Sequence, residues 1–89
     1  MGFGFVASPT YQEGATDADL YSQAIADCAS AHAMGYDTAW FIEHHFSDYF
    51  PTPSPFVFMA SIAAHCPDLN LGTCVTVTPW YHPLRFAEE

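Results

Sequence analysis

The sequence predicts an α/β fold in which parallel strands alternate with helices. Three apolar runs have the length and composition of buried strands, and the two segments between them carry helical spacing and helix start signals. A helix that joins two strands returns the chain to the same end of the sheet, so the strands run parallel with right-handed crossovers. The expected order is β-α-β-α-β with a further helix, within one domain of residues 1–89.

The first predicted unit is a short strand over residues 3–7 and a helix. Thr16 and Asp19 form a helix start signal, because a threonine hydroxyl and an acidic side chain three residues later satisfy free backbone donors. Gly35 is expected to end the helix, since glycine readily adopts the left-handed conformation found there. Between them, apolar residues recur on one helical face: Leu20, Ala24, Cys28 and Ala31.

The second unit begins with a predicted strand over residues 38–42. Its β-branched and aromatic residues are typical of a strand that is covered on both faces. A polar and aromatic loop follows over 43–53. Ser54 and Pro55 then supply an N-cap and a first-turn proline, so a second helix is expected over 55–65.

A third strand is predicted over residues 69–78, followed by a helix that begins near His82 and Pro83. Gly72 interrupts this strand. Such a glycine marks a bulge or a close approach of a ligand to the backbone, or it meets a packing need between strand and helix.

The length and the exposed sheet edges indicate part of a larger fold. Three parallel strands leave two unpaired edges, and the chain stops inside a predicted helix. A closed barrel of eight βα units has about 250 residues, so these 89 residues are expected to be a fragment, the first third of a TIM (β/α)8 barrel.

Charge excludes two classes of partner. Ten acidic residues face one basic residue, Arg85, which gives a formal net charge of −9. Nucleic acids and anionic membranes both require clustered Lys and Arg, so neither is expected to bind. A phosphorylated ligand would need most of its phosphate site outside this sequence.

Cysteine usage and hydropathy predict a cytoplasmic protein. Cys28, Cys66 and Cys74 are odd in number and form no CxxC pair, which is typical of reduced thiols. No signal peptide is recognisable, and no apolar run approaches the ~18 residues that span a bilayer.

Chemistry is expected where the second strand ends, at Glu43, His44 and His45. In parallel βα folds the loops at the carboxyl ends of the strands converge on one mouth. His82 follows the third strand and would join the same rim. Histidine suits proton transfer because its unperturbed pKa is about 6.5.

Other interpretations of these residues remain open. Histidines in loops are often structural, and the nearby aromatics, Phe46, Tyr49 and Phe50, form a pocket wall or simply cover the mouth. A metal site built from the EHH run and His82 is disfavoured, because adjacent histidines project in different directions and no H-E-x-x-H spacing is present. We therefore expect no metal.

Five ordered motifs carry a resemblance to a known family. They are the strand entry GYDTAW, the turn EHHF, the helix start SP, the strand segment LGT and the final HPLRFAEE. Closely over residues 35–89, the sequence resembles the N-terminal region of bacterial luciferase-like, flavin-dependent monooxygenases.

The resemblance implies a (β/α)8 barrel that uses reduced FMN and O2 on a small organic substrate, with a flavin reductase as partner and a homodimer as assembly. By position, His44 matches the catalytic acid/base, and Glu43 matches a carboxylate near the cofactor. Cys74 and Val75 match the segment that packs against the flavin ring, where many members have a cis peptide. Two alternatives stay open: an oxidoreductase that uses the deazaflavin F420, and an inactive barrel fragment that self-associates through 55–65.

Overall fold

A three-stranded parallel sheet organises the chain. The computed structural model describes all residues, 1–89. The strands lie in the order β1-β2-β3, and both neighbouring pairs are parallel. This confirms the predicted β-α-β-α-β order. The elements are β1 (Gly4–Val6), α1 (Asp17–Ala33), β2 (Thr38–Phe41), α2 (Pro55–His65), β3 (Asn70–Thr73), a 3-10 turn (Thr78–Trp80) and α3 (Pro83–Glu88).

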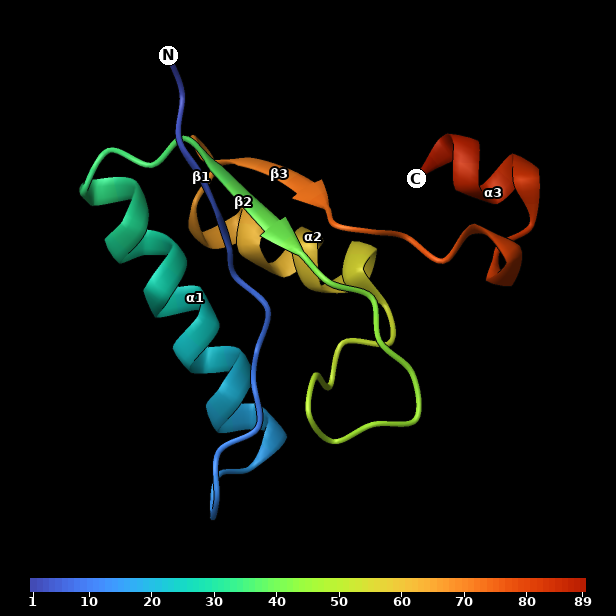
Figure 1. Ribbon diagram of the computed structural model, residues 1–89. Coiled ribbons are helices and arrows are strands. Elements are labelled where there is room, and N and C mark those ends of the chain that lie inside the picture. The colour runs from blue at the N-terminus through green and yellow to red at the C-terminus, as the bar shows by residue number, and fades with distance from the viewer.

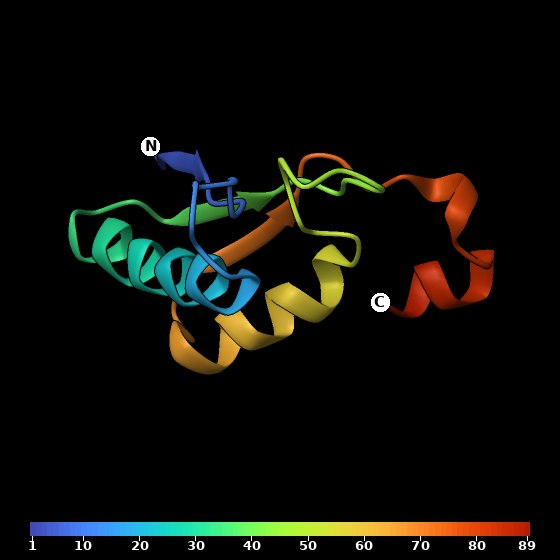
Figure 2. The same ribbon diagram turned by 90° about the horizontal axis from the view of Figure 1, so that it is seen from below.

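Both long helices cover the same face of the sheet. Figure 2 shows α1 and α2 as one layer beneath the strands, while the opposite face carries no helix. In Figure 1, α3 lies apart from the sheet, beyond the carboxyl end of β3. The core fills the space between the sheet and the two helices, and it consists of Ala7, Ala24, Cys28, Ala39, Phe41, Phe58, Ile62, Cys66 and Leu69.

The ends of the helices largely follow the predicted signals. Thr16 and Asp19 form a reciprocal capping box at the start of α1. Gly35 adopts a φ of 97° just beyond the end of this helix, as expected of the terminating glycine. Pro55 occupies the first turn of α2, and Ser54 stands at the N-cap position. Both predicted positions are confirmed, although the Ser54 side chain makes no capping hydrogen bond.

The strands are shorter than predicted, and β3 differs most. It ends at Thr73, five residues before the predicted end at residue 78. Thr73 pairs with Phe41, the last residue of β2, and the Cys74 N–H still donates to the Phe41 carbonyl at 2.7 Å. Because β2 ends at Phe41, the residues after Cys74 have no strand residue opposite them. The apolar, β-branched sequence up to residue 78 therefore continues as irregular backbone.

Coverage of β2 on both faces is not observed within this chain. Ala39 and Phe41 are fully buried between the sheet and the helices, whereas Trp40 points to the other face and is 41% exposed. A Cβ at Gly72 would lie 2.5 Å from the Trp40 ring, and one at Gly4 would lie 2.6 Å from its Nε1. Gly72 keeps regular register with Trp40, so it forms no bulge. It makes room for an indole on the open face.

Candidate active site at the carboxyl ends of the strands

The two segments that carry the predicted site residues leave the sheet at the same edge. Residues 42–54 follow β2 and residues 74–82 follow β3. Since the strands are parallel, both segments begin at their carboxyl ends, and Figure 1 shows them leaving the sheet side by side. The fold therefore brings the loop that carries Glu43, His44 and His45 and the segment that begins at Cys74 to one edge of the sheet.

Glu43 is the one buried carboxylate of this rim and joins the two segments. Its side chain is fully buried. Oε1 lies 2.6 Å from His45 Nε2, and Oε2 accepts a hydrogen bond from the Val77 backbone N–H at 2.7 Å. Both oxygens are therefore engaged by partners within the chain, one by the imidazole of His45 and the other by a backbone donor.

The adjacent histidines face different neighbours, as expected of consecutive residues in an extended loop. The His45 ring stacks on Trp80, with centroids 4.6 Å apart and planes 8° from parallel. His44 is exposed, and its ring meets the edge of Phe50 at 5.9 Å. The His44 backbone N–H donates to the Thr52 carbonyl at 3.1 Å. Loop geometry thus leaves the His44 ring accessible and holds the His45 ring against the second segment.

Tyr81 adds a phenol to the same rim. Burial raises its pKa, and so does the negative charge of the neighbouring Glu43. Its ring also packs near Phe56 of α2 and Phe86 of α3, at 5.7 and 5.6 Å. This aromatic contact connects α3 to the start of α2.

Cys74 and Val75 form the exposed start of the second segment. Cys74 is solvent-accessible, Val75 is 69% exposed, and the peptide bond between them is cis. The hydroxyl of Thr76 donates to that of Thr73 at 2.8 Å, which ties the segment back to β3. The rim therefore presents two exposed residues, Cys74 and Val75, at the start of the segment that Glu43 contacts at Val77.

Two hydrogen bonds hold the long loop after β2 in place. The Tyr21 hydroxyl of α1 donates to the Pro51 carbonyl. The Tyr11 N–H donates to the Tyr49 carbonyl at 2.9 Å. Phe46 is 96% exposed at the tip and has a φ of 54°, a conformation that is uncommon for a non-glycine residue.

Sequence analysis missed Val77, Trp80 and Tyr81, which complete the rim. The signal for them was present, since an aromatic pair follows directly after the third apolar run. His82 does not join the rim contacts. Its Nδ1 instead accepts the Leu84 N–H at 3.3 Å and caps α3.

No group of three or more His, Cys, Asp or Glu side chains lies close enough to hold a metal ion. His65 instead makes a local structural contact, since its Nδ1 lies 2.8 Å from the Ser61 carbonyl one turn earlier in α2. None of the helices is both long and apolar enough to cross a membrane.

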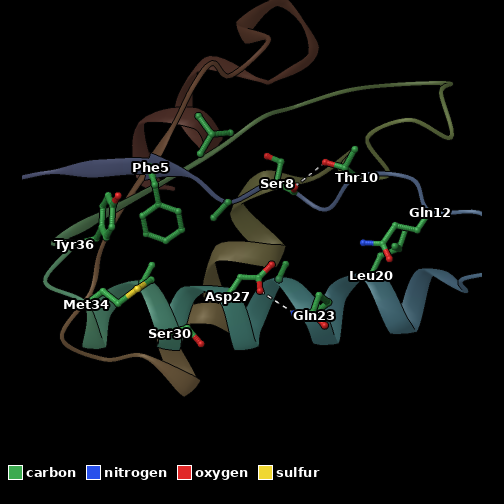
Figure 3. A pocket seen from close by; sticks show the side chains of 14 residues that line it. Phe5, Ser8, Thr10, Gln12, Leu20, Gln23, Asp27, Ser30, Met34 and Tyr36 are labelled. Carbon is green, nitrogen blue, oxygen red and sulfur yellow. Dashed lines mark hydrogen bonds between the residues drawn. The ribbon is translucent and has the colours of Figure 1, made fainter.

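A separate hollow of about 450 Å³ lies between β1 and α1. Figure 3 shows Phe5 and Tyr36 at one end of it and Leu20 at the other. Its lining holds no histidine or cysteine, and its one carboxylate, Asp27, accepts a hydrogen bond from Gln23 at 2.8 Å. The hollow therefore lacks the imidazole groups found at the rim.

Parallel βα units with polar and aromatic loops at the carboxyl ends of the strands define an α/β protein. The chain belongs to the luciferase-like monooxygenase family, whose model matches residues 1–89. The predicted family is thereby confirmed.

Two curated relatives illustrate this membership. The chain is 32% identical over 85 residues to the oxygenase component of a flavin-dependent trigonelline monooxygenase from Acinetobacter baylyi, covering 96% of this chain and 24% of that protein. It is 32% identical over 81 residues to the alkanal monooxygenase alpha chain of the Kryptophanaron alfredi symbiont, covering 90% and 23%. The chain thus spans about a quarter of their length.

A solved structure supports the fold. The oxygenating constituent of 3,6-diketocamphane monooxygenase from Pseudomonas putida, a type II Baeyer-Villiger monooxygenase in complex with FMN, superimposes with a TM-score of 0.85. The match has 21% sequence identity and covers 98% of this chain and 24% of that one.

Proposed function

We propose that this chain forms part of the active site of a flavin-dependent monooxygenase that uses reduced FMN and O2 on a small organic substrate. One observation carries the proposal: Glu43 joins the EHH loop to the backbone after β3 through a 2.7 Å hydrogen bond to Val77. Membership of the luciferase-like family and the FMN in the superimposed Baeyer-Villiger monooxygenase support it. Reduced FMN, when bound, supplies the electrons that activate oxygen.

The residues at the rim suit a flat, largely apolar ring. Cys74 and Val75 are exposed and would lie against the ring. Glu43 holds the same segment two residues later, by accepting the hydrogen bond of the Val77 N–H. His44 is exposed beside Phe50 and would exchange a proton with the bound reactants, since an imidazole can both accept and donate a proton.

The flavin phosphate would be held outside these 89 residues. Arg85 is the sole Lys or Arg of the chain, and its guanidinium already faces Glu89 at 2.8 Å and Glu88 at 3.6 Å. A phosphate dianion needs several donors, and these two carboxylates repel it.

A flavin reductase is the proposed partner, because the trigonelline relative is described as an oxygenase component. We further propose a cytoplasmic homodimer. Free Cys28, Cys66 and Cys74 favour a reducing compartment. Val57, an apolar residue of α2 that is 72% exposed, favours a protein contact there.

The test uses the intact protein that contains this chain. Reduced FMN is mixed with the protein and then with O2, and flavin re-oxidation is followed by absorbance. We expect re-oxidation to be slower than that of free flavin and His44→Ala to change it, whereas His65→Ala, a remote control on α2, leaves it unchanged. Re-oxidation at the rate of free flavin, unaffected by His44→Ala, contradicts the proposal. The absorbance of co-purified cofactor distinguishes FMN from a deazaflavin.

A further inference from the structure

The carboxylate of Glu43 acts on one specific nitrogen of His45. Its Oε1 lies 2.6 Å from Nε2, and its side chain is fully buried while that of His45 is 21% exposed. The second oxygen is occupied by the Val77 N–H at 2.7 Å, so the carboxyl group has no freedom to rotate away. The His45 contact is therefore a fixed, charge-assisted hydrogen bond.

This contact determines which nitrogen of His45 carries the proton in the neutral ring. A carboxylate accepts and never donates, so Nε2 must be the N–H nitrogen. Nδ1 then carries the lone pair, and it makes no hydrogen bond to any group of the chain. Trp80 stacks on the ring at 8° and limits its rotation.

We propose that Glu43 is a positioning residue that fixes His45 as the Nε2–H tautomer and so leaves Nδ1 as a hydrogen-bond and proton acceptor for a ligand at the rim. A proton taken up by Nδ1 would give an imidazolium whose positive charge is balanced by Glu43. The titratable groups that face this ring are Glu43 and, beside that carboxylate, Tyr81. The ligand part of this inference rests on the proposed function, whereas the tautomer does not.

A purely structural role for Glu43 predicts a different outcome from a positioning role. If Glu43 only joins the two segments, its loss affects stability and cofactor binding but not the state of the His45 ring. In the positioning role, Glu43→Gln keeps the shape of the side chain, but one end becomes an amide donor. Since Val77 N–H requires the remaining oxygen, the amide faces Nε2 and forces the proton to Nδ1.

The experiment measures the ¹⁵N shifts of the imidazole nitrogens in the intact, ¹⁵N-histidine-labelled protein, with His45 assigned through His45→Gln. We expect the Nε2–H tautomer in the native protein, the Nδ1–H tautomer in Glu43→Gln, and no change in Glu88→Gln, an exposed carboxylate control. A native Nδ1–H ring, a mixture of tautomers, or an unchanged ring in Glu43→Gln overturns the inference. The native spectrum decides this even if Glu43→Gln fails to fold.

Kinetics test the role of Nδ1 at the rim. With a substrate of the intact enzyme, Glu43→Gln and His45→Gln are each expected to lower kcat by roughly 100-fold. FMN affinity should stay near the native value, and the double variant should be no slower than the slower single one. The proposed role of Nδ1 toward a ligand is overturned if the kcat losses of the two single variants add up in the double variant. It is also overturned if Glu43→Gln switches the tautomer of His45 but keeps the native kcat. Failure of the native protein to bind FMN refutes the proposed function but leaves the tautomer result standing.

Discussion

The two faces of the sheet are built from opposite kinds of residue, although these alternate along the same strands. On the helix-covered face, Ala39 and Phe41 are fully buried and pack against α1 and α2. On the open face, Trp40 lies across the sheet, and its neighbouring strands carry glycine at positions 4 and 72. The covered face is therefore stabilised by side chains that pack against one another. On the open face, glycines in the neighbouring strands leave space for the Trp40 ring.

The largest expected effect is on the covered face. Phe41→Ala removes a fully buried ring that meets Phe58 edge-on at 5.4 Å, so the free energy of unfolding should fall by about 3–5 kcal/mol. Urea denaturation measures this. Leu84→Ala, at a position of α3 that is 72% exposed, should change it by less than about 0.5 kcal/mol. Equal effects of the two substitutions would show that the covered face is not the packed core.

An intermediate effect is expected on the open face. Gly72→Ala places a methyl group against the Trp40 ring, so unfolding should become easier by about 1–3 kcal/mol. In the double variant with Trp40→Ala, the added methyl group has space, and most of its cost should disappear. A double-mutant cycle by urea denaturation measures this coupling. Strict additivity would mean that Trp40 does not determine the need for glycine.

The smallest effect concerns the pH dependence of the covered face. Burial, followed by the neighbouring Cys66 and Asp27, raises the pKa of Cys28 from 9.0 to about 11. Below pH 9.0 the Cys28 thiol keeps its proton in both the folded and the unfolded protein. The contribution of the buried, protonated thiol to the free energy of unfolding is therefore fully present. Above that pH only the unfolded thiol ionises, and the contribution is lost as the pH rises to about 11.

Urea midpoints of the native protein and Cys28→Ala across this pH range measure the difference. The native protein should lose more stability than the variant as the pH increases. Parallel curves would show that the Cys28 thiol ionises equally easily in both states.

Local signals made much of the fold predictable. The capping box of Thr16 and Asp19 and the position of Gly35 depend on residues a few positions apart, and the sequence shows them directly. The end of β3 at Thr73 was not predictable in this way, because it depends on where β2 stops offering hydrogen bonds. The role of Gly72 depends likewise on Trp40 in the neighbouring strand.

The same difference between local signals and contacts with distant residues applies to the candidate site. Its location at the end of β2 followed from the parallel topology, which brings carboxyl ends to one edge. Its internal contacts did not, because the hydrogen bond of Glu43 to Val77 and the stack of His45 on Trp80 join residues more than 30 positions apart. Spacing within one loop therefore identified the residue types of the site but not their partners.

The most direct test of the account is whether FMN covers the exposed segment that begins at Cys74. Iodoacetamide labelling of the intact protein, read by mass spectrometry, gives the rate of modification for each cysteine. We expect Cys74 to react readily without FMN and much more slowly with saturating FMN, while buried Cys28 and Cys66 stay unreactive in both samples. An equal rate for Cys74 in both samples, with FMN binding verified by fluorescence, would contradict the proposed position of the flavin.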